Sequence, residues 1–152
     1  MQPLFDIQEL FFHITHVVCN LEYKAKGHIE PTLEVSASLK KIPRKQNIWH
    51  IGLSVSTPAN MDNITFPYEF FLNASATLIH VPPEEMTREQ FKQIKKLLYV
   101  NGASVLYSAM RDRLLLLTGN SLHHAYCLPS FRFNPDDFED LDKKRKENHG
   151  DK

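Results

Sequence analysis

The histidines and cysteines are the side chains of this sequence whose types could do chemistry, as metal ligands or as nucleophile and base. The chain has 8 histidines and 2 cysteines. His13 and His16 are three residues apart, which places them on one face of a helix but on opposite faces of a strand. His123 and His124 are adjacent, which suits a loop better than a chelating pair. Because no Cys-x-x-Cys or His-Glu-x-x-His spacing occurs, the pattern predicts scattered surface histidines and no metal site.

Nucleophilic catalysis would need a nucleophile beside a base, and a third group that orients the base. Cys127 is close to His123 and His124 in the sequence, but no orienting group is evident and no Gly-x-Ser-x-Gly elbow occurs. A small buried thiol beside Leu128 is the stronger interpretation. The 5 glycines are dispersed and form no phosphate-binding loop. The sequence therefore predicts neither an enzyme nor a cofactor.

The charge balance argues against general nucleic-acid binding. The chain carries 18 basic and 18 acidic side chains, so its formal net charge is zero. A protein that binds phosphates without sequence preference needs a basic surplus to release counterions. The basic run Lys40-Lys41 with Arg44-Lys45 is typical of a solvated turn around Pro43. We therefore expect no nucleic-acid partner.

Length and composition indicate one soluble domain. Of the 152 residues, 42% are hydrophobic and 24% are charged. This composition suits a domain whose core is stable without disulfides or structural metal ions. The N-terminus lacks the basic region of a signal peptide, and no apolar run reaches the length of a membrane span. Two thiols, Cys19 and Cys127, fit a reducing compartment such as the cytoplasm. We expect a domain over residues 1–141, no membrane insertion, and a disordered charged tail over 142–152.

Four segments have the composition and alternation of β-strands. They cover residues 5–24, 32–42, 48–57 and 64–81. In the first, the pairs Phe11-Phe12 and Val17-Val18 place apolar groups on both faces. A β-bulge or burial on both sides would produce this pattern, although a helix competes over the first half. In the last, the small Ala74 and Ala76 leave room for a helix to lie close.

Two helices are expected after the strands. Thr87, with Gln90 three residues later, forms a candidate capping box that begins the first helix. A break at Asn101-Gly102 begins the second, with Asn101 as its N-cap, and Gly119-Asn120 supplies the left-handed residue that ends it. A short terminal helix could follow, with Phe138 and Leu141 as anchors. Strands followed by helices predict an α+β domain with helices on one face of a four-stranded antiparallel sheet.

The second expected helix is apolar on more than one side. Its main stripe consists of residues three or four positions apart: Ala103, Leu106, Tyr107, Met110, Leu114 and Leu117. The four consecutive leucines from Leu114 to Leu117 occupy more of the helix circumference than one apolar stripe does. Such a helix is covered on more than one side, either by a second layer of its own chain or by another subunit.

The aromatic content exceeds what one sheet and one helical layer can easily cover. The chain has 10 Phe, 5 Tyr and 1 Trp, and several fall on both sides of one element, as Phe11/Phe12, Phe70/Phe71 and Phe131/Phe133 do. Uncovered aromatic side chains mark a subunit interface or a binding groove. Together these residues favour an interaction protein over an enzyme.

The stretch from Val100 to Phe133 carries a family resemblance. It contains Asn-Gly-Ala-Ser-x-Leu-Tyr-x-x-x-Arg from Asn101, an apolar helix end, and Leu-Pro-Ser-Phe-Arg-Phe from Leu128. This pattern resembles the C-terminal half of the SecB protein-export chaperones, over about a quarter of the chain. The order of strands and helices expected from the residues agrees with the fold that the resemblance implies.

The resemblance implies a bacterial cytoplasmic chaperone that holds unfolded polypeptides in long apolar grooves, without a cofactor or covalent chemistry. It implies a homo-oligomer, a dimer or a tetramer built as a dimer of dimers, with the main helices between the sheets. The residues expected at the oligomer interface are Leu106, Met110, Leu114 and Leu117. The residues expected to bind clients are apolar and mostly aromatic: Phe11, Trp49, Phe71, Tyr126, Leu128, Phe131, Phe133 and Phe138.

The chain departs from the SecB pattern in its charge. The family is typically acidic, and its negative sheet surface docks the export ATPase SecA, whereas this chain is neutral. The polar strand faces are expected to carry few acids, such as Glu34 and Glu69. The main helix also has Ser108 where the family pattern suggests proline. SecA is therefore the least supported partner, and the alternative function is a dedicated-client chaperone of a toxin–antitoxin type, or an oligomeric adaptor of the same fold.

Overall fold

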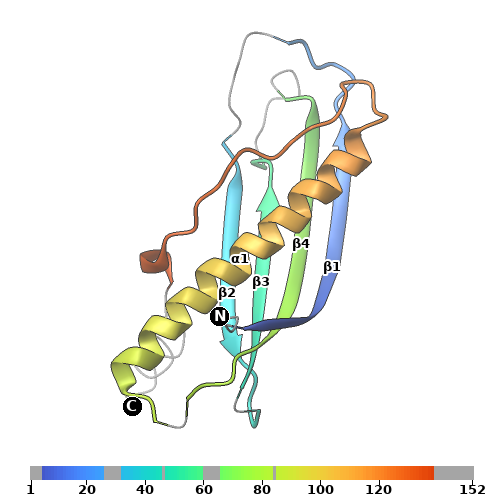
Figure 1. Ribbon diagram of the computed structural model, residues 1–152. Helices are drawn as coiled ribbons and strands as arrows, with labels where there is room; N and C mark the ends of the chain where they lie inside the picture. The colour runs from blue at the N-terminus through green and yellow to red at the C-terminus, as the bar shows by residue number, and fades with distance from the viewer. Residues whose placement is uncertain (1–4, 26–31, 46, 60–65, 84, 139–152) are drawn as a thin grey trace, which may run out of the picture.

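The computed structural model describes residues 5–25, 32–45, 47–59, 66–83 and 85–138. Its elements are β1 (Asp6–Cys19), β2 (Glu34–Lys41), β3 (Ile48–Ser56), β4 (Tyr68–Ile79), α1 (Arg88–Thr118) and the 3₁₀ turn η1 (Pro135–Asp137). Within these residues, four strands precede one long helix (Figure 1), which confirms the α+β class. The charged tail expected over 142–152 and the expected anchor Leu141 lie outside the described residues.

The strands form one antiparallel sheet in the order β1-β4-β3-β2. Helix α1 crosses one face of this sheet obliquely (Figure 1) and contacts β2, β3 and β4. The core lies between helix and sheet, because β3 and β4 turn alternate apolar side chains toward α1. These side chains include Trp49, Ile51, Leu53, Val55, Tyr68, Phe70, Leu72 and Leu78. The face of the sheet that points away from α1 is covered by no helix in the described part of the chain, and we call it the open face.

Strand β1 is irregular along the edge of the sheet. Its pairing with β4 shifts at two positions, the second of them between Phe12 and Ile14, which agrees with the β-bulge, one of the two interpretations of the paired apolar residues. Phe12 packs against the core, where the guanidinium of Arg113 lies 4.7 Å from its ring centroid. Phe11 points to the other face and is 53% exposed.

Helix α1 is continuous over 31 residues. The break expected at Asn101-Gly102 is therefore wrong, and Asn101 is not an N-cap. The helix begins at the predicted capping box: the Gln90 N–H donates to Thr87 Oγ1 (3.2 Å), and the Thr87 N–H donates to Gln90 Oε1 (2.8 Å). The two helices expected from the sequence are thus one.

Gly102 lies where α1 packs closely on the sheet. A Cβ at this position would lie 3.0 Å from Leu78 Cδ1 and 3.3 Å from two side-chain carbons of Ile51. Glycine lowers helix propensity by about 1 kcal/mol relative to alanine. However, Leu98 and Leu106, one turn before and after it, are both fully buried. Tertiary packing offsets the local cost, so the helix continues through the glycine.

The end of α1 differs from the expectation at Gly119-Asn120. Gly119 has φ −56°, and the left-handed conformation is adopted later, by His124 with φ 64°. The helix end is organised by Thr118, whose Oγ1 donates to the Leu114 carbonyl and accepts from the Tyr126 N–H, both at 2.7 Å. This buried hydroxyl joins the helix to the segment that follows it.

Replacing Thr118 with valine is expected to lower the free energy of unfolding by about 1–3 kcal/mol, because the Tyr126 N–H would lose its acceptor. Urea denaturation followed by circular dichroism measures this change. Thr118→Ser is the matched control, since it keeps the hydroxyl and should stay close to wild type. A loss in Thr118→Ser without a loss in Thr118→Val would show that the methyl group, not the hydroxyl, holds the segment.

After α1 the chain returns along the helix as an extended segment (Figure 1), residues 124–134, which we call the returning segment. Leu128 and Phe133 insert into the core and are 0% and 5% exposed. The Tyr107 hydroxyl donates to the Pro129 carbonyl at 2.8 Å and fixes the segment between these anchors. Up to residue 138, where the described residues end, the short helix expected at the C-terminal end appears as the three-residue turn η1.

Candidate functional site

Two of the described histidines connect elements of the fold. His13 Nε2 hydrogen-bonds Ser75 Oγ across β1 and β4 (2.6 Å), and His123 Nε2 hydrogen-bonds the Asn20 carbonyl (2.7 Å). No group of three metal-ligating side chains gathers among the described residues. His13 and His123 therefore supply hydrogen bonds within the fold.

Both cysteines are free thiols. Cys127 is exposed, so the buried thiol expected beside Leu128 is wrong. The Nε of Arg111 donates to Cys127 Sγ at 2.9 Å, and this hydrogen bond raises the pKa of Arg111 above its usual value. His123, the base suggested by sequence proximity, is bound to the Asn20 carbonyl. Cys127 and His123 are thus each hydrogen-bonded to another group and not to each other.

Four exposed apolar side chains on the open face form the candidate site. We call them the open-face cluster: Phe11, Ile14, Val18 and Phe71. Their exposed fractions are 53%, 47%, 42% and 36%. They share one face of the sheet. Phe71 and the β4 residues that pair with Phe11, Ile14 and Val18 all occupy alternate positions of β4, on the side of the strand opposite to the buried Leu72 and Ala74. A gathering of large apolar groups on one uncovered face marks an interaction surface.

Strand β1 is also an edge strand, since β4 is its only neighbour in the described sheet. The outer backbone N–H and C=O groups of its 14 residues therefore have no strand beside them within the described part of the chain. An exposed edge can pair with another extended chain through main-chain hydrogen bonds. The cluster and this edge lie side by side, which suits contact with an extended polypeptide.

Three of the eight residues predicted to bind clients lie inside the chain's own core. Trp49 is 4% exposed, Leu128 0% and Phe133 5%. These assignments are corrected, because a side chain enclosed by its own chain has no surface left for a client. Phe11, Phe71 and Phe131 are exposed, the last at 47%.

The remaining two predicted client-binding residues, Tyr126 and Phe138, are half-buried in aromatic contacts. The Tyr126 ring lies 5.8 Å from that of Phe70 and 6.1 Å from that of Tyr68. Burial raises the pKa of Tyr126 to about 12. The Phe138 ring lies 5.3 Å from that of Tyr99. Both rings therefore help to attach the C-terminal part of the chain to the fold.

The residues predicted at an oligomer interface are mostly internal. Leu106, Met110 and Leu114 are 0% exposed and pack in the core between α1 and the sheet, so these assignments are corrected as well. Leu117 is 48% exposed. Three more apolar side chains of α1 are exposed and lie off this stripe by helical spacing: Leu97, Val105 and Leu116. Together with Leu117, at the end of the stripe, we call them the outer helix face.

Several residues of the candidate site are absent from the set predicted from the sequence. Ile14 and Val18 belong to the open-face cluster, and Val105 and Leu116 belong to the outer helix face. The signal for the first pair was present, because the apolar residues of β1 fall on both faces of a strand. A two-sided strand at the edge of a sheet must expose one of its apolar sides unless something covers it.

No helix in the described residues combines the length and hydropathy needed to cross a membrane.

The fold is SecB-like. The chain aligns with the SecB-like chaperone Rv1957 of Mycobacterium tuberculosis, solved in complex with a ChAD peptide from the HigA1 antitoxin, with a TM-score of 0.61. Identity is 14%, over 86% of this chain and 92% of that chain. This likeness confirms the architecture expected from the sequence.

A second solved structure, of a Streptococcus agalactiae protein of unknown function, is less similar. Its TM-score is 0.42 at 14% identity, over 84% of this chain and 97% of that chain. No protein-family model and no curated protein matches the chain.

Proposed function

We propose that this protein is a SecB-like holdase chaperone, which binds unfolded or non-native polypeptides without a cofactor. The observation that carries the proposal is the open-face cluster beside the free edge of β1. The SecB-like fold supports it. Phe11 and Phe71 are the largest side chains of the cluster and supply most of its apolar area.

The physical basis of holding is non-directional burial. Apolar surface removed from water contributes roughly 25 cal/mol per Å² whatever the sequence that covers it. An uncovered apolar face can therefore accept many clients, and the edge of β1 can add main-chain hydrogen bonds that are also independent of sequence. Neither interaction requires a folded partner, which suits an extended or collapsed non-native chain.

Self-association is part of the proposal. The outer helix face exposes Leu97, Val105, Leu116 and Leu117, with exposed fractions from 37% to 81%. Apolar residues on the solvent side of a helix are covered when a second subunit packs there. We propose a cytoplasmic homo-oligomer, a dimer or a tetramer, in which this face lies between subunits.

Export is not included in the proposal. Docking to SecA would need a negative sheet surface, whereas the open-face sides of β2 and β4 carry few described acids, chiefly Glu34 and Glu69, and the chain as a whole is neutral. The second candidate function is a chaperone dedicated to one client, such as an antitoxin, or an adaptor of the same fold. It is favoured by the antitoxin peptide bound in the structure of Rv1957.

The test is the refolding of a slow-folding, chemically denatured protein that is diluted into excess of this one. We expect delayed refolding and suppressed aggregation, which saturate at a defined stoichiometry. No effect on several unrelated clients would contradict the general holdase and favour the dedicated-client alternative. In that case, capture of one partner from the native host by the purified protein would identify the client.

A further inference from the structure

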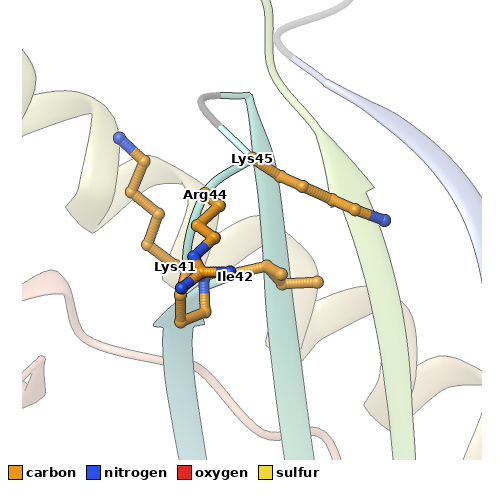
Figure 2. Close-up of a pocket in the computed structure, with 5 residues that line it drawn as sticks. Lys41, Ile42, Arg44 and Lys45 are labelled. Atoms are coloured by element: carbon orange, nitrogen blue, oxygen red, sulfur yellow. The ribbon is translucent and has the colours of Figure 1, made fainter.

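The turn between β2 and β3 gathers positive charge around a surface depression. Lys41, Ile42, Pro43, Arg44 and Lys45 line this depression, whose volume is about 370 Å³ (Figure 2). We call these five residues the basic turn. The Ile42 N–H donates to the Ile48 carbonyl at 3.0 Å, which closes the turn at the end of the sheet.

Arg44 occupies an unusual backbone position in the basic turn. Its φ is 65°, in the left-handed region that side-chain-bearing residues rarely adopt and that favours glycine or asparagine. Stability alone would not select an arginine there. Its side chain is exposed, so packing does not account for it either. A charged side chain at a strained, exposed position is more readily explained by contact with a partner.

The three cations diverge from the turn. Figure 2 shows Lys41 directed toward α1 and Lys45 directed across β3, with Arg44 between them. Lys41 Nζ lies 5.9 Å from the Trp49 ring and 5.7 Å from the Phe91 ring. Such divergence suits several separated negative groups better than one compact anion.

These cations have no acidic partner in the described part of the chain. An ion pair found there joins Lys96 to Asp136 at 2.7 Å. Among the described residues, no carboxylate lies within 4.0 Å of Lys41, Arg44 or Lys45. Because the whole chain has 18 basic and 18 acidic side chains, the positive charge of the turn is a local feature.

We infer that the basic turn binds an acidic, extended segment of a polypeptide client. This inference deepens the proposed function and rests on it. An extended acidic segment carries several separated negative groups, which suits cations that leave the turn in different directions. The turn also borders the open face, where Ile48 and Ile79 pair across β3 and β4. A client on the open-face cluster could therefore continue to the turn.

A nucleic-acid partner fits the observations less well. Firm binding to a phosphate backbone uses roughly 6–10 cationic contacts, whereas the turn offers Lys41, Arg44 and Lys45. The neutral net charge of the chain supplies no long-range attraction for a polyanion. An acidic polypeptide needs fewer ion pairs, because its apolar residues can also contact the open face.

The experiment uses two synthetic peptides with the same apolar centre, one flanked by Asp and Glu and one by Ser and Thr. Fluorescence anisotropy measures the affinity of each for the full chain at low and high salt. At low salt the acidic peptide should bind about fivefold more tightly, the advantage expected of two exposed ion pairs. High salt should remove the advantage, because it screens exposed charges.

The test variant is R44Q/K45Q, which leaves Lys41 over the Trp49 and Phe91 rings. The matched control is K24Q/R132Q, which removes two exposed positive charges outside the turn. R44Q/K45Q should bind both peptides with the affinity that wild type has for the neutral one, and the control should keep the acidic preference. Circular dichroism establishes that both variants are folded.

Equal affinity of wild type for the two peptides would overturn the inference, as would a preference that survives in R44Q/K45Q or disappears in the control. Competition by oligothymidine as strong as that by the acidic peptide would assign the turn to nucleic acid instead. Binding of the neutral peptide tests the proposed function separately. If wild type binds only the acidic peptide, and through the turn, the turn is an acidic-peptide site but the holdase proposal fails, and with it the inference that this peptide is part of a client.

Discussion

Replacing both Phe11 and Phe71 with threonine is expected to abolish client holding while the fold is kept. A fully buried phenylalanine contributes roughly 1.5–3 kcal/mol, and these two are already about half buried before a client arrives. Losing both should cost on the order of 2–3 kcal/mol, which weakens binding about a hundredfold. Threonine preserves strand propensity, so β1 and β4 should still pair. The concentration of protein that half-suppresses aggregation of a denatured client measures the loss.

The matched control for this prediction is Leu21→Thr with Val81→Thr. These residues are more exposed than the two phenylalanines, at 79% and 73%, but they lie beyond the ends of β1 and β4. The control should hold clients as well as wild type does. Full activity in the phenylalanine variant would contradict a client site on the open face. A simultaneous loss in the control would instead indicate non-specific adhesion through any exposed apolar residue.

The fold could be predicted largely because three of its four strands, β2, β3 and β4, alternate cleanly. In β3, apolar residues such as Trp49, Ile51 and Val55 occupy every second position, and polar or small residues lie between them. Burial follows the same period. The helix was harder. Gly102 lowers local helix propensity, yet α1 continues through it because the sheet packs against it on that side. A sequence displays the propensity of a residue but not the tertiary contact that overrides it.

The candidate site could be predicted only in part. An aromatic residue has the same composition signal whether it is enclosed, as Trp49 and Phe133 are, or exposed, as Phe11 is. Which face of a sheet its own chain covers depends on where α1 and the returning segment lie. The helical stripe through Leu106 and Met110 was found by its period, but a period selects the most buried side of a helix. It therefore located the core and not the surface available to a second subunit.

The returning segment carries both an enclosed and an exposed apolar residue, and the second large effect is expected there. Leu128→Ala should lower the free energy of unfolding by about 2–5 kcal/mol, because a fully buried leucine leaves a cavity when it is truncated. Phe131→Ala is the matched control on the same segment. Since Phe131 is 47% exposed, its truncation should cost less than about 1 kcal/mol. Urea denaturation of both variants measures the difference.

The same pair of variants separates an anchor from a client contact. Leu128 lies one residue before Pro129, whose carbonyl accepts from the Tyr107 hydroxyl, so its truncation should increase amide hydrogen exchange near the Tyr126–Thr118 hydrogen bond before the fold is lost. Client binding by folded Leu128→Ala should stay close to that of wild type, because this side chain offers no surface. If Leu128→Ala weakened client binding while exchange and stability were unchanged, Leu128 would have to leave the core in the active state. The buried position described here would then belong to a closed form of the protein.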